Sequence, residues 1–172
     1  MENEFDQIYN RSYPFLLKYV IAKIDCISNA EDILQEVYLK LLLIIDRKGL
    51  SYIKNERKFL LKLTKNELYK YYSLREKFKS VFIRDDEVID TLLLSDTQSN
   101  SNNDIDLKID IKDIWDFISK EPIDVQKILC LYYLADCSIK SIALFLGMNE
   151  STVKTKLYRT RDKLREKYGR RL

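Results

Sequence analysis

The sequence predicts an all-α protein: two small helical domains joined by a flexible acidic linker, with a helix-turn-helix in the C-terminal domain. Only three glycines and two prolines interrupt its 172 residues, and this scarcity favours long helices with short connections. Apolar residues recur at helical spacing, and no alternating segment bounded by turn residues indicates a strand. A polar stretch without periodicity, residues 95–104, separates the helical parts. We therefore expect domains at residues 1–83 and 107–172 and the linker at residues 84–106.

The first helix should extend from the N-terminus to about Ile24. Its core stripe consists of apolar residues that recur about one helical turn apart, namely Phe5, Ile8, Tyr9, Tyr13, Leu16, Leu17 and Val20. The next helix should begin at a capping box, in which the Ser28 side chain bonds the backbone amide of Glu31 and the glutamate reaches back.

This second helix has an apolar and a polar face. The apolar face carries Ala30, Ile33, Leu34, Val37 and Leu41. The polar face carries Asp32, Gln35, Glu36 and Lys40. From the residues alone, a solvated surface is the favoured interpretation of the polar face, and a binding surface is the alternative.

A basic and aromatic third helix is expected at residues 58–78, after a connection at residues 46–58 that contains Gly49. Residues 54–79 hold nine Lys or Arg and three acids. Such cations can neutralise phosphates while exposed rings stack on unpaired bases, although some of the rings must belong to the core. This pattern alone does not choose between nucleic-acid binding and a packed helix with a solvated basic face.

The C-terminal domain should open with two packing helices on either side of Pro122. Their apolar positions are Ile109, Ile111, Ile114, Trp115 and Ile118 in the first helix and Val125, Ile128, Leu129, Tyr132 and Tyr133 in the second. We expect Trp115 to anchor the core.

Residues 138–167 have the spacing of a helix-turn-helix. Ala143 precedes Gly147 by four residues and Val153 by ten, which allows two short helices to pack around a tight turn. Ser138 and Asn149 are the expected N-caps of the two helices.

The second helix of this motif is amphipathic and basic. Residues 150–172 hold nine Lys or Arg and three acids. An apolar stripe consists of Val153, Leu157 and Leu164. The opposite side carries Lys154, Thr155, Tyr158, Arg159 and Asp162. A basic helix on a rigid turn suits the major groove of DNA, and a solvated charged face is the weaker alternative.

The composition disfavours an enzyme. The chain has no histidine, no Gly-rich phosphate loop and no nucleophile elbow. Cys26, Cys130 and Cys137 lack metal-ligand spacing and are expected to be reduced core thiols, so we expect no metal and no cofactor. The N-terminus lacks a leader, and the longest apolar run, residues 128–135, is far shorter than the ~20 residues of a membrane span. We expect a cytoplasmic protein without membrane insertion.

Three segments, in this order, resemble the bacterial RNA polymerase sigma factors of the short extracytoplasmic-function type, in the sigma-70 family. AEDILQEVYLKL, residues 30–41, is similar to the helix that grips the clamp coiled coil of RNA polymerase. KFLLKLTKNELYKYY, residues 58–72, is similar to the helix that reads the promoter −10 element. The helix-turn-helix is similar to the reader of the −35 element, so the resemblance omits only the linker.

The resemblance implies a transcription initiation factor that binds core RNA polymerase, at its clamp coiled coil and its flap, and directs it to promoter DNA. The implied polymerase contacts are Asp32, Gln35, Glu36 and Lys40. The implied −10 contacts are Lys62, Lys65, Asn66, Tyr69 and Lys70, with the connection at residues 46–58 holding a flipped base. The implied −35 contacts are Ser151, Thr152, Lys154, Thr155, Tyr158, Arg159 and Arg161. Family members often have an anti-sigma factor as a further partner.

The chain departs from the family pattern at several positions. The family usually has Trp at the position of Phe59, an acid at Lys70, Arg at Ser73 and Glu at Ser141. Lys156 replaces a common arginine, which keeps the charge and loses the bidentate fork.

Two other functions are alternatives to a sigma factor. A stand-alone helix-turn-helix regulator would bind an operator as a dimer, with half-sites about one helical turn apart. A structural or toxin-like helical protein with incidental basic faces would show no sequence-specific DNA binding.

Overall fold

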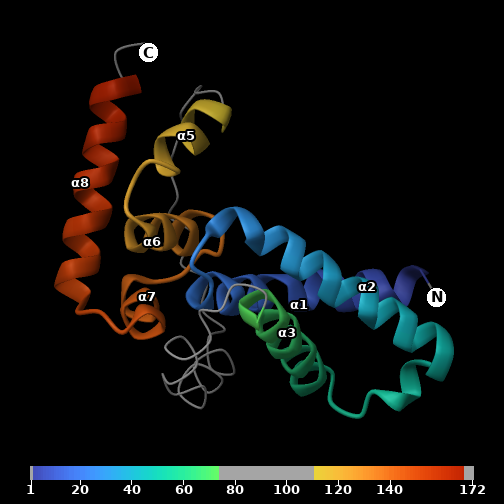
Figure 1. Cartoon of the computed structure of the whole chain (residues 1–172). Coiled ribbons are helices and arrows are strands. Elements are labelled where there is room, and N and C mark those ends of the chain that lie inside the picture. Colours follow the sequence, from blue (N-terminus) through green and yellow to red (C-terminus); the bar gives the residue numbers. More distant parts are fainter. Residues whose placement is uncertain (1, 74–110, 169–172) are drawn as a thin grey trace. The chain divides into compact units, whose positions relative to one another are not determined.

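The computed structural model describes residues 2–73 and 111–168 (Figure 1). The chain divides into two compact units, Met1–Leu93 and Leu94–Leu172. Every regular element in the described residues is a helix, which confirms the all-α prediction. The predicted linker at residues 84–106, with both of its boundaries, lies outside the described residues.

The first unit is built from three helices that pack against one another in pairs: α1 (Glu2–Lys23), α2 (Ala30–Lys48) and α3 (Glu56–Ser73). Their fully buried side chains include Leu16, Tyr19, Val20, Val37, Leu41, Leu60, Leu68 and Tyr72. The Tyr72 hydroxyl donates to the Lys23 carbonyl at 2.6 Å. This bond satisfies a carbonyl at the end of α1, where the helix offers no partner of its own.

The start of α2 differs from the prediction, and the capping box is wrong. A 3₁₀ turn, Ile27–Asn29, precedes α2, so the N-cap is Asn29 and not Ser28. The Asn29 side chain makes no cap bond; its Nδ2 donates to the Tyr71 hydroxyl of α3 at 3.1 Å. The Ser28 hydroxyl lies 3.1 Å from Cys26 Sγ. A contact with α3 therefore replaces the local pattern.

The connection between α2 and α3 is shorter than predicted, because both helices extend into residues 46–58. α2 ends at Gly49, whose φ of +74° is in the region that favours glycine and whose amide donates to the Ile45 carbonyl at 2.8 Å. A 3₁₀ turn, Leu50–Tyr52, follows. Asn55 then caps α3, because its Oδ1 accepts from the Lys58 amide at 3.0 Å.

The second unit contains α5 (Ile111–Ile118), α6 (Ile123–Tyr133), α7 (Ile139–Leu146) and α8 (Glu150–Tyr168). Helices α6, α7 and α8 pack against one another around the buried residues Val125, Ile128, Leu129, Ile142, Ala143, Phe145, Val153 and Leu157. The helix-turn-helix prediction is confirmed at two positions. The Ser141 amide donates to Ser138 Oγ at 3.1 Å, and Gly147 ends α7 in the left-handed conformation, at φ 63° and ψ 40°.

Two predictions about the core need correction. Trp115 is 39% exposed, because the short helix α5 turns Ile114, Phe117 and Ile118 towards partial burial and leaves Trp115 outside. Cys26 is half-buried, whereas Cys130 and Cys137 are buried as predicted. Burial raises the pKa of the Cys130 thiol to about 11.

No helix in the described part of the chain is long and apolar enough to cross a membrane. Residues 2–73 and 111–168 contain no group of three or more His, Cys, Asp or Glu side chains placed to hold a metal ion.

Candidate functional site

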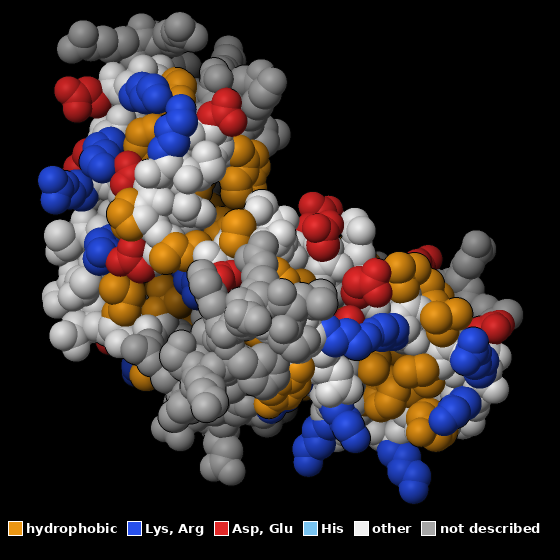
Figure 2. Space-filling model, viewed as in Figure 1, with side chains coloured by type: hydrophobic (Ala, Val, Ile, Leu, Met, Phe, Trp, Pro, Cys, Tyr) orange, Lys and Arg blue, Asp and Glu red, His pale blue; other side chains and the backbone are white. Residues whose placement is uncertain are grey.

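The predicted polar face of α2 is exposed and continues into an apolar surface. Asp32, Gln35 and Glu36 are all exposed. Further along the same helix three leucines are exposed by 54%, 41% and 53%: Leu39, Leu42 and Leu43. We call these six residues the α2 face. Figure 2 shows acidic side chains followed by apolar ones along α2. The prediction from the sequence did not include these leucines. The apolar arc of the helix is too wide for one buried stripe, and this width indicates that some apolar residues are exposed.

A groove of about 330 Å³ lies between α1 and α2, beside the α2 face. Its lining includes Phe5, Tyr9, Tyr13, Gln35, Tyr38, Leu39 and Leu42. The rings of Tyr9 and Tyr38 pack with their centroids 4.7 Å apart. Burial raises the pKa of Tyr38 to about 12, so its hydroxyl is neutral near pH 7 and pairs with the Ser12 hydroxyl at 2.8 Å. The groove therefore offers an apolar wall with neutral polar groups and the carboxylate of Glu31.

Lys40, the fourth predicted polymerase contact, lies at the interface between α2 and α3. Its ammonium pairs with the Glu67 carboxylate of α3, which is 7% exposed. Lys70 reaches the same carboxylate oxygen at 3.4 Å. Burial is the largest single influence and opposes the charge of Lys40, but the hydrogen bond with Glu67 and the neighbouring charges together raise the pKa of Lys40. Lys40 therefore joins two helices and stands at the edge of the α2 face.

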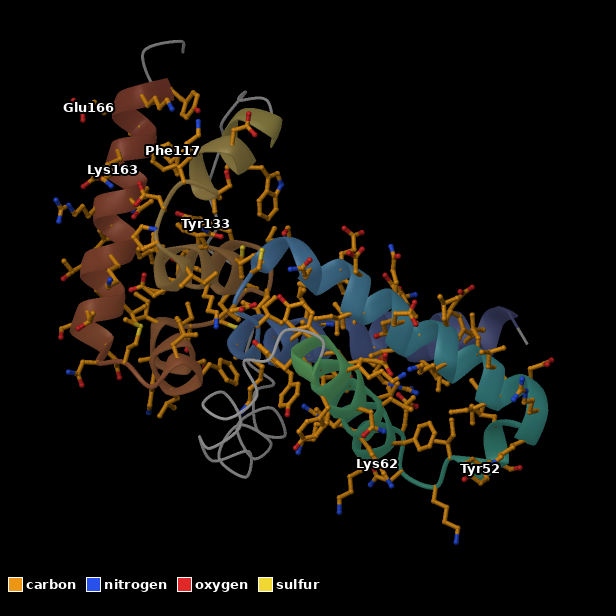
Figure 3. The ribbon with its side chains drawn as sticks, viewed as in Figure 1. Tyr52, Lys62, Phe117, Tyr133, Lys163 and Glu166 are labelled. Carbon is orange, nitrogen blue, oxygen red and sulfur yellow. The ribbon has the colours of Figure 1, made fainter. Side chains whose placement is uncertain are left out.

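The predicted −10 residues of α3 share one side of the helix. Lys62, Asn66 and Tyr69 are exposed, and Lys65 is half-buried. In Figure 3, Lys62 extends from α3 away from α1 and α2. Positions 58, 62, 65 and 69 follow the spacing of one helical stripe. Lys70 is exposed but turns towards Glu67. The structure thus brings four of the five predicted residues together as a basic surface with one ring.

Tyr52 extends this surface, and the sequence did not single it out. Its ring is 50% exposed and lies in the connection before α3, as Figure 3 shows. Lys48 Nζ lies 4.3 Å from the ring centroid. Phe59 supports the ring edge-on at 6.3 Å. An aromatic residue directly after a glycine-containing bend is the signal that could have identified it, because such a ring is held outside the core.

The predicted −35 residues lie mainly on the outer side of α8. Six of the seven are exposed and Thr152 is half-buried. Tyr158 is 43% exposed. The Thr155 hydroxyl donates to the Ser151 carbonyl at 2.8 Å. The Arg161 guanidinium lies 4.9 Å from the Tyr158 ring centroid and its Nε lies 3.9 Å from an Asp162 oxygen, so Arg161 is held towards its own helix.

Three other cations of α8 face the rest of the unit, and we call them the seam lysines: Lys156, Lys163 and Lys167. Lys156 Nζ bonds Asp124 Oδ2 of α6 at 2.5 Å. Lys163 Nζ bonds Glu121 Oε1 at 2.9 Å. Lys167 Nζ lies 5.3 Å from the Phe117 ring centroid of α5.

The seam lysines leave α8 seven and four residues apart, which places them on one stripe. Figure 3 labels Phe117, Tyr133 and Lys163, which come from the three helices along this seam, and Glu166, which points away from it. The hydrogen bond from Lys156 holds the pKa of Asp124 below its ordinary value. The basic charge of α8 is thus divided between an outer face and a structural seam.

Comparisons with known proteins find similarity to sigma factors. The family model of sigma-70 region 4 matches residues 113–164. The ECF RNA polymerase sigma factor SigM of Bacillus subtilis (strain 168) is 29% identical over 170 residues, covering 98% of this chain and 95% of SigM. A solved structure of the sigma factor RpoE in complex with the anti-sigma factor NepR from Bartonella quintana covers 95% of each chain at 19% identity, with a TM-score of 0.46.

Proposed function

Because this chain belongs to the sigma-70 family, as a sigma factor of the extracytoplasmic-function type, we propose that its two units divide the work of transcription initiation. It binds core RNA polymerase and promoter DNA. One observation supports this division of work: three exposed surfaces lie on three different helices. They are the α2 face, the basic side of α3 and the outer side of α8. A dimeric operator-binding regulator needs the third surface but has no use for the α2 face.

The α2 face is the proposed docking surface for core polymerase. Asp32, Gln35 and Glu36 offer charge and hydrogen bonds, and the exposed leucines offer apolar area that a free surface leaves in water. A helix of the polymerase clamp could pack along this face, with an apolar side chain entering the groove between α1 and α2. Lys40 contributes by fixing α2 against α3.

The basic side of α3 is the proposed reader of the melted −10 element. Lys62 and Lys65 would neutralise phosphates, while Asn66 offers both donors and an acceptor to a base edge. Tyr69 and Tyr52 expose ring faces on which unpaired bases can stack. An unpaired base is captured by binding, so strand opening needs no covalent step.

The outer side of α8 is the proposed reader of the −35 duplex. Lys154, Thr155, Tyr158 and Arg159 would face base edges in the major groove, with Ser151, Thr152 and Arg161 near the backbone. The capped turn before α8 fixes the helix relative to α7. The seam lysines then hold the outer side in one orientation.

Neither reader needs high affinity by itself. Once polymerase fixes both units, the second reader binds at the effective concentration set by its tether. Sigma factors are generally transcription factors without enzymatic activity, and the mechanism proposed for this chain has no chemical step. Bacterial transcription takes place in the cytoplasm, which is the compartment that this function requires.

Charge reversal at Asp32 and Glu36 tests the docking surface. Both residues are exposed, so Asp32→Lys with Glu36→Lys should leave the circular dichroism spectrum unchanged and abolish co-purification with core polymerase. A matched control reverses Asp116 and Glu166, two exposed acids of the second unit, and should keep binding. Retention of the first variant on core polymerase, at the level of the control, would remove the α2 face from the proposal.

A further inference from the structure

The first turn of α3 carries a guanidinium with a buried nitrogen that lacks a hydrogen-bond partner in the described part of the chain. Arg57 Nε is buried, and it makes no hydrogen bond within the described residues. Burial lowers the pKa of Arg57 without making it neutral, since arginine stays charged in proteins. A charged donor in a partly dry position without an acceptor is unfavourable. Such a group is expected where an acceptor arrives from outside.

The surroundings hold Arg57 in place without neutralising it. Its Cζ lies 4.7 Å from the centroid of the Phe15 ring of α1, a cation–π contact that fixes the plane of the guanidinium. The neighbouring carboxylate of Glu56 is already bound by Arg11, through Nε at 3.1 Å and Nη2 at 2.5 Å. Arg57 is thus oriented by a ring, while the nearest acid in the sequence serves another arginine.

The position of Arg57 is continuous with the basic side of α3. Positions 57, 61 and 65 follow one edge of the helix, the edge that faces α1. Lys65 repeats the arrangement two turns later, with its Nζ 6.0 Å from the Tyr19 ring of α1. Lys58 and Lys62 lie on the adjoining exposed side. The cations of α3 therefore extend around the helix from its exposed basic side to the edge that packs against α1.

We propose that Arg57 is a phosphate-binding residue that anchors the backbone of the promoter strand where α1 meets α3. The planar fork of arginine suits a phosphate, and the stack on Phe15 presets its orientation, so little freedom is lost on binding. A backbone contact fixes the strand without reading its sequence. This inference rests on the proposed function, because it assigns the anion to promoter DNA.

The salt dependence of promoter binding tests the assignment. The probe is the reconstituted holoenzyme on a promoter fragment that the wild-type holoenzyme transcribes, titrated between about 50 and 200 mM salt. Arg57→Gln should weaken binding about tenfold. It should also reduce the slope of log affinity against log salt by about 0.7 to 0.9, the effect of one lost phosphate contact. The loss should be equal on fragments with different −10 sequences.

Two further variants separate a phosphate contact from a packing role. Arg57→Lys keeps the charge and should restore the slope while recovering only part of the affinity. Arg11→Gln removes a guanidinium from the same pair of helices that is already bound to Glu56, and should leave the slope unchanged.

Three results would overturn the inference. One is an unchanged slope in Arg57→Gln, and another is a slope that falls equally in Arg11→Gln. The third is a loss confined to some −10 sequences, which would make Arg57 a base contact. If the wild-type holoenzyme transcribes no promoter, the proposed function itself fails, and this outcome is distinct because it appears before any variant is made.

Discussion

The two basic helices, α3 and α8, use their cations in opposite ways. In α8 the charge is divided lengthwise: Lys154 and Arg159 face outwards, while the seam lysines contact an acid of α6, an acid in the connection before α6 and a ring of α5. In α3 the buried charged group is an acid. The Glu67 carboxylate forms ion pairs with Lys40 of α2 and with Lys70 of its own helix. The net charge of a helix therefore does not indicate which of its cations are available to DNA.

The difference lies in where the counter-charges come from. Asp124 lies in the first turn of α6 and Glu121 in the connection before this helix, and each pairs with a lysine of α8. In the first unit, α2 and α3 share a single carboxylate, so each helix contributes one cation to it. Substitutions at an outer cation, at Glu67 and at a seam lysine should accordingly affect different measurements.

The largest effect is expected on DNA binding by the outer side of α8. Arg159→Ala should cost about 1 to 3 kcal/mol in promoter binding by the holoenzyme if the guanidinium makes a bidentate base contact, and should relax sequence choice in the −35 element. Arg159 is exposed, so thermal unfolding should not change. A uniform loss on all promoters would instead assign Arg159 to the phosphate backbone.

The next effect concerns the buried acid of the first unit. Glu67→Gln should lower the free energy of unfolding by about 1 to 2 kcal/mol, because Lys40 then lacks a full counter-charge in a partly buried position. Chemical denaturation of the full chain, followed by circular dichroism, measures it. Glu36→Gln is the matched control on the exposed side of α2 and should stay within about 0.5 kcal/mol of wild type. Equal losses in both variants would contradict the special role of Glu67.

A smaller effect is expected at the seam. Lys156→Gln should lower the stability of the second unit by about 0.2 to 1 kcal/mol, since both partners are partly exposed. Trp115 is the single tryptophan of the chain, so its fluorescence reports on this unit. The choice of −35 sequence should be unchanged. Altered sequence choice, with stability intact, would place Lys156 on the DNA side after all.

The smallest effect is a pH dependence of the same ion pair. The bond from Lys156 holds the pKa of Asp124 below its ordinary value of 3.8. As the pH falls, the unfolded carboxyl takes up its proton first. The stability contributed by this pair is therefore complete above about pH 4 and is lost as the pH falls through the folded pKa. Asp124→Asn should reduce the loss of unfolding free energy at acid pH, with unfolding measured by Trp115 fluorescence. The same loss at acid pH in Asp124→Asn and wild type would contradict the pairing.

Local patterns predicted much of this molecule. The helical spacing, the Ser138 cap and the turn at Gly147 depend on near neighbours, and the structure confirms all three. The predictions failed where distant residues decide. Asn29 bonds Tyr71 across 42 positions, and this tertiary contact replaces the capping box at Ser28.

In the candidate site, too, near neighbours in the sequence decide some features and distant residues decide others. The outer side of α8 follows from helical phase, and its six exposed residues match the sequence pattern. The seam lysines could not be separated from it, because their partners are set by the packing of α6 against α8. Tyr52 and Arg57 depend on rings brought to them by folding, Phe59 and Phe15. The roles of the contact residues stay predictions.

Transcription by the purified chain with core RNA polymerase tests the central claim most directly. On genomic DNA fragments, the reconstituted holoenzyme should start transcripts at defined sites that share two unlike upstream elements, near −35 and −10, and replacing either element should abolish the transcript. Specific binding to a palindrome without polymerase, or defined transcripts that survive loss of either element, would contradict the account.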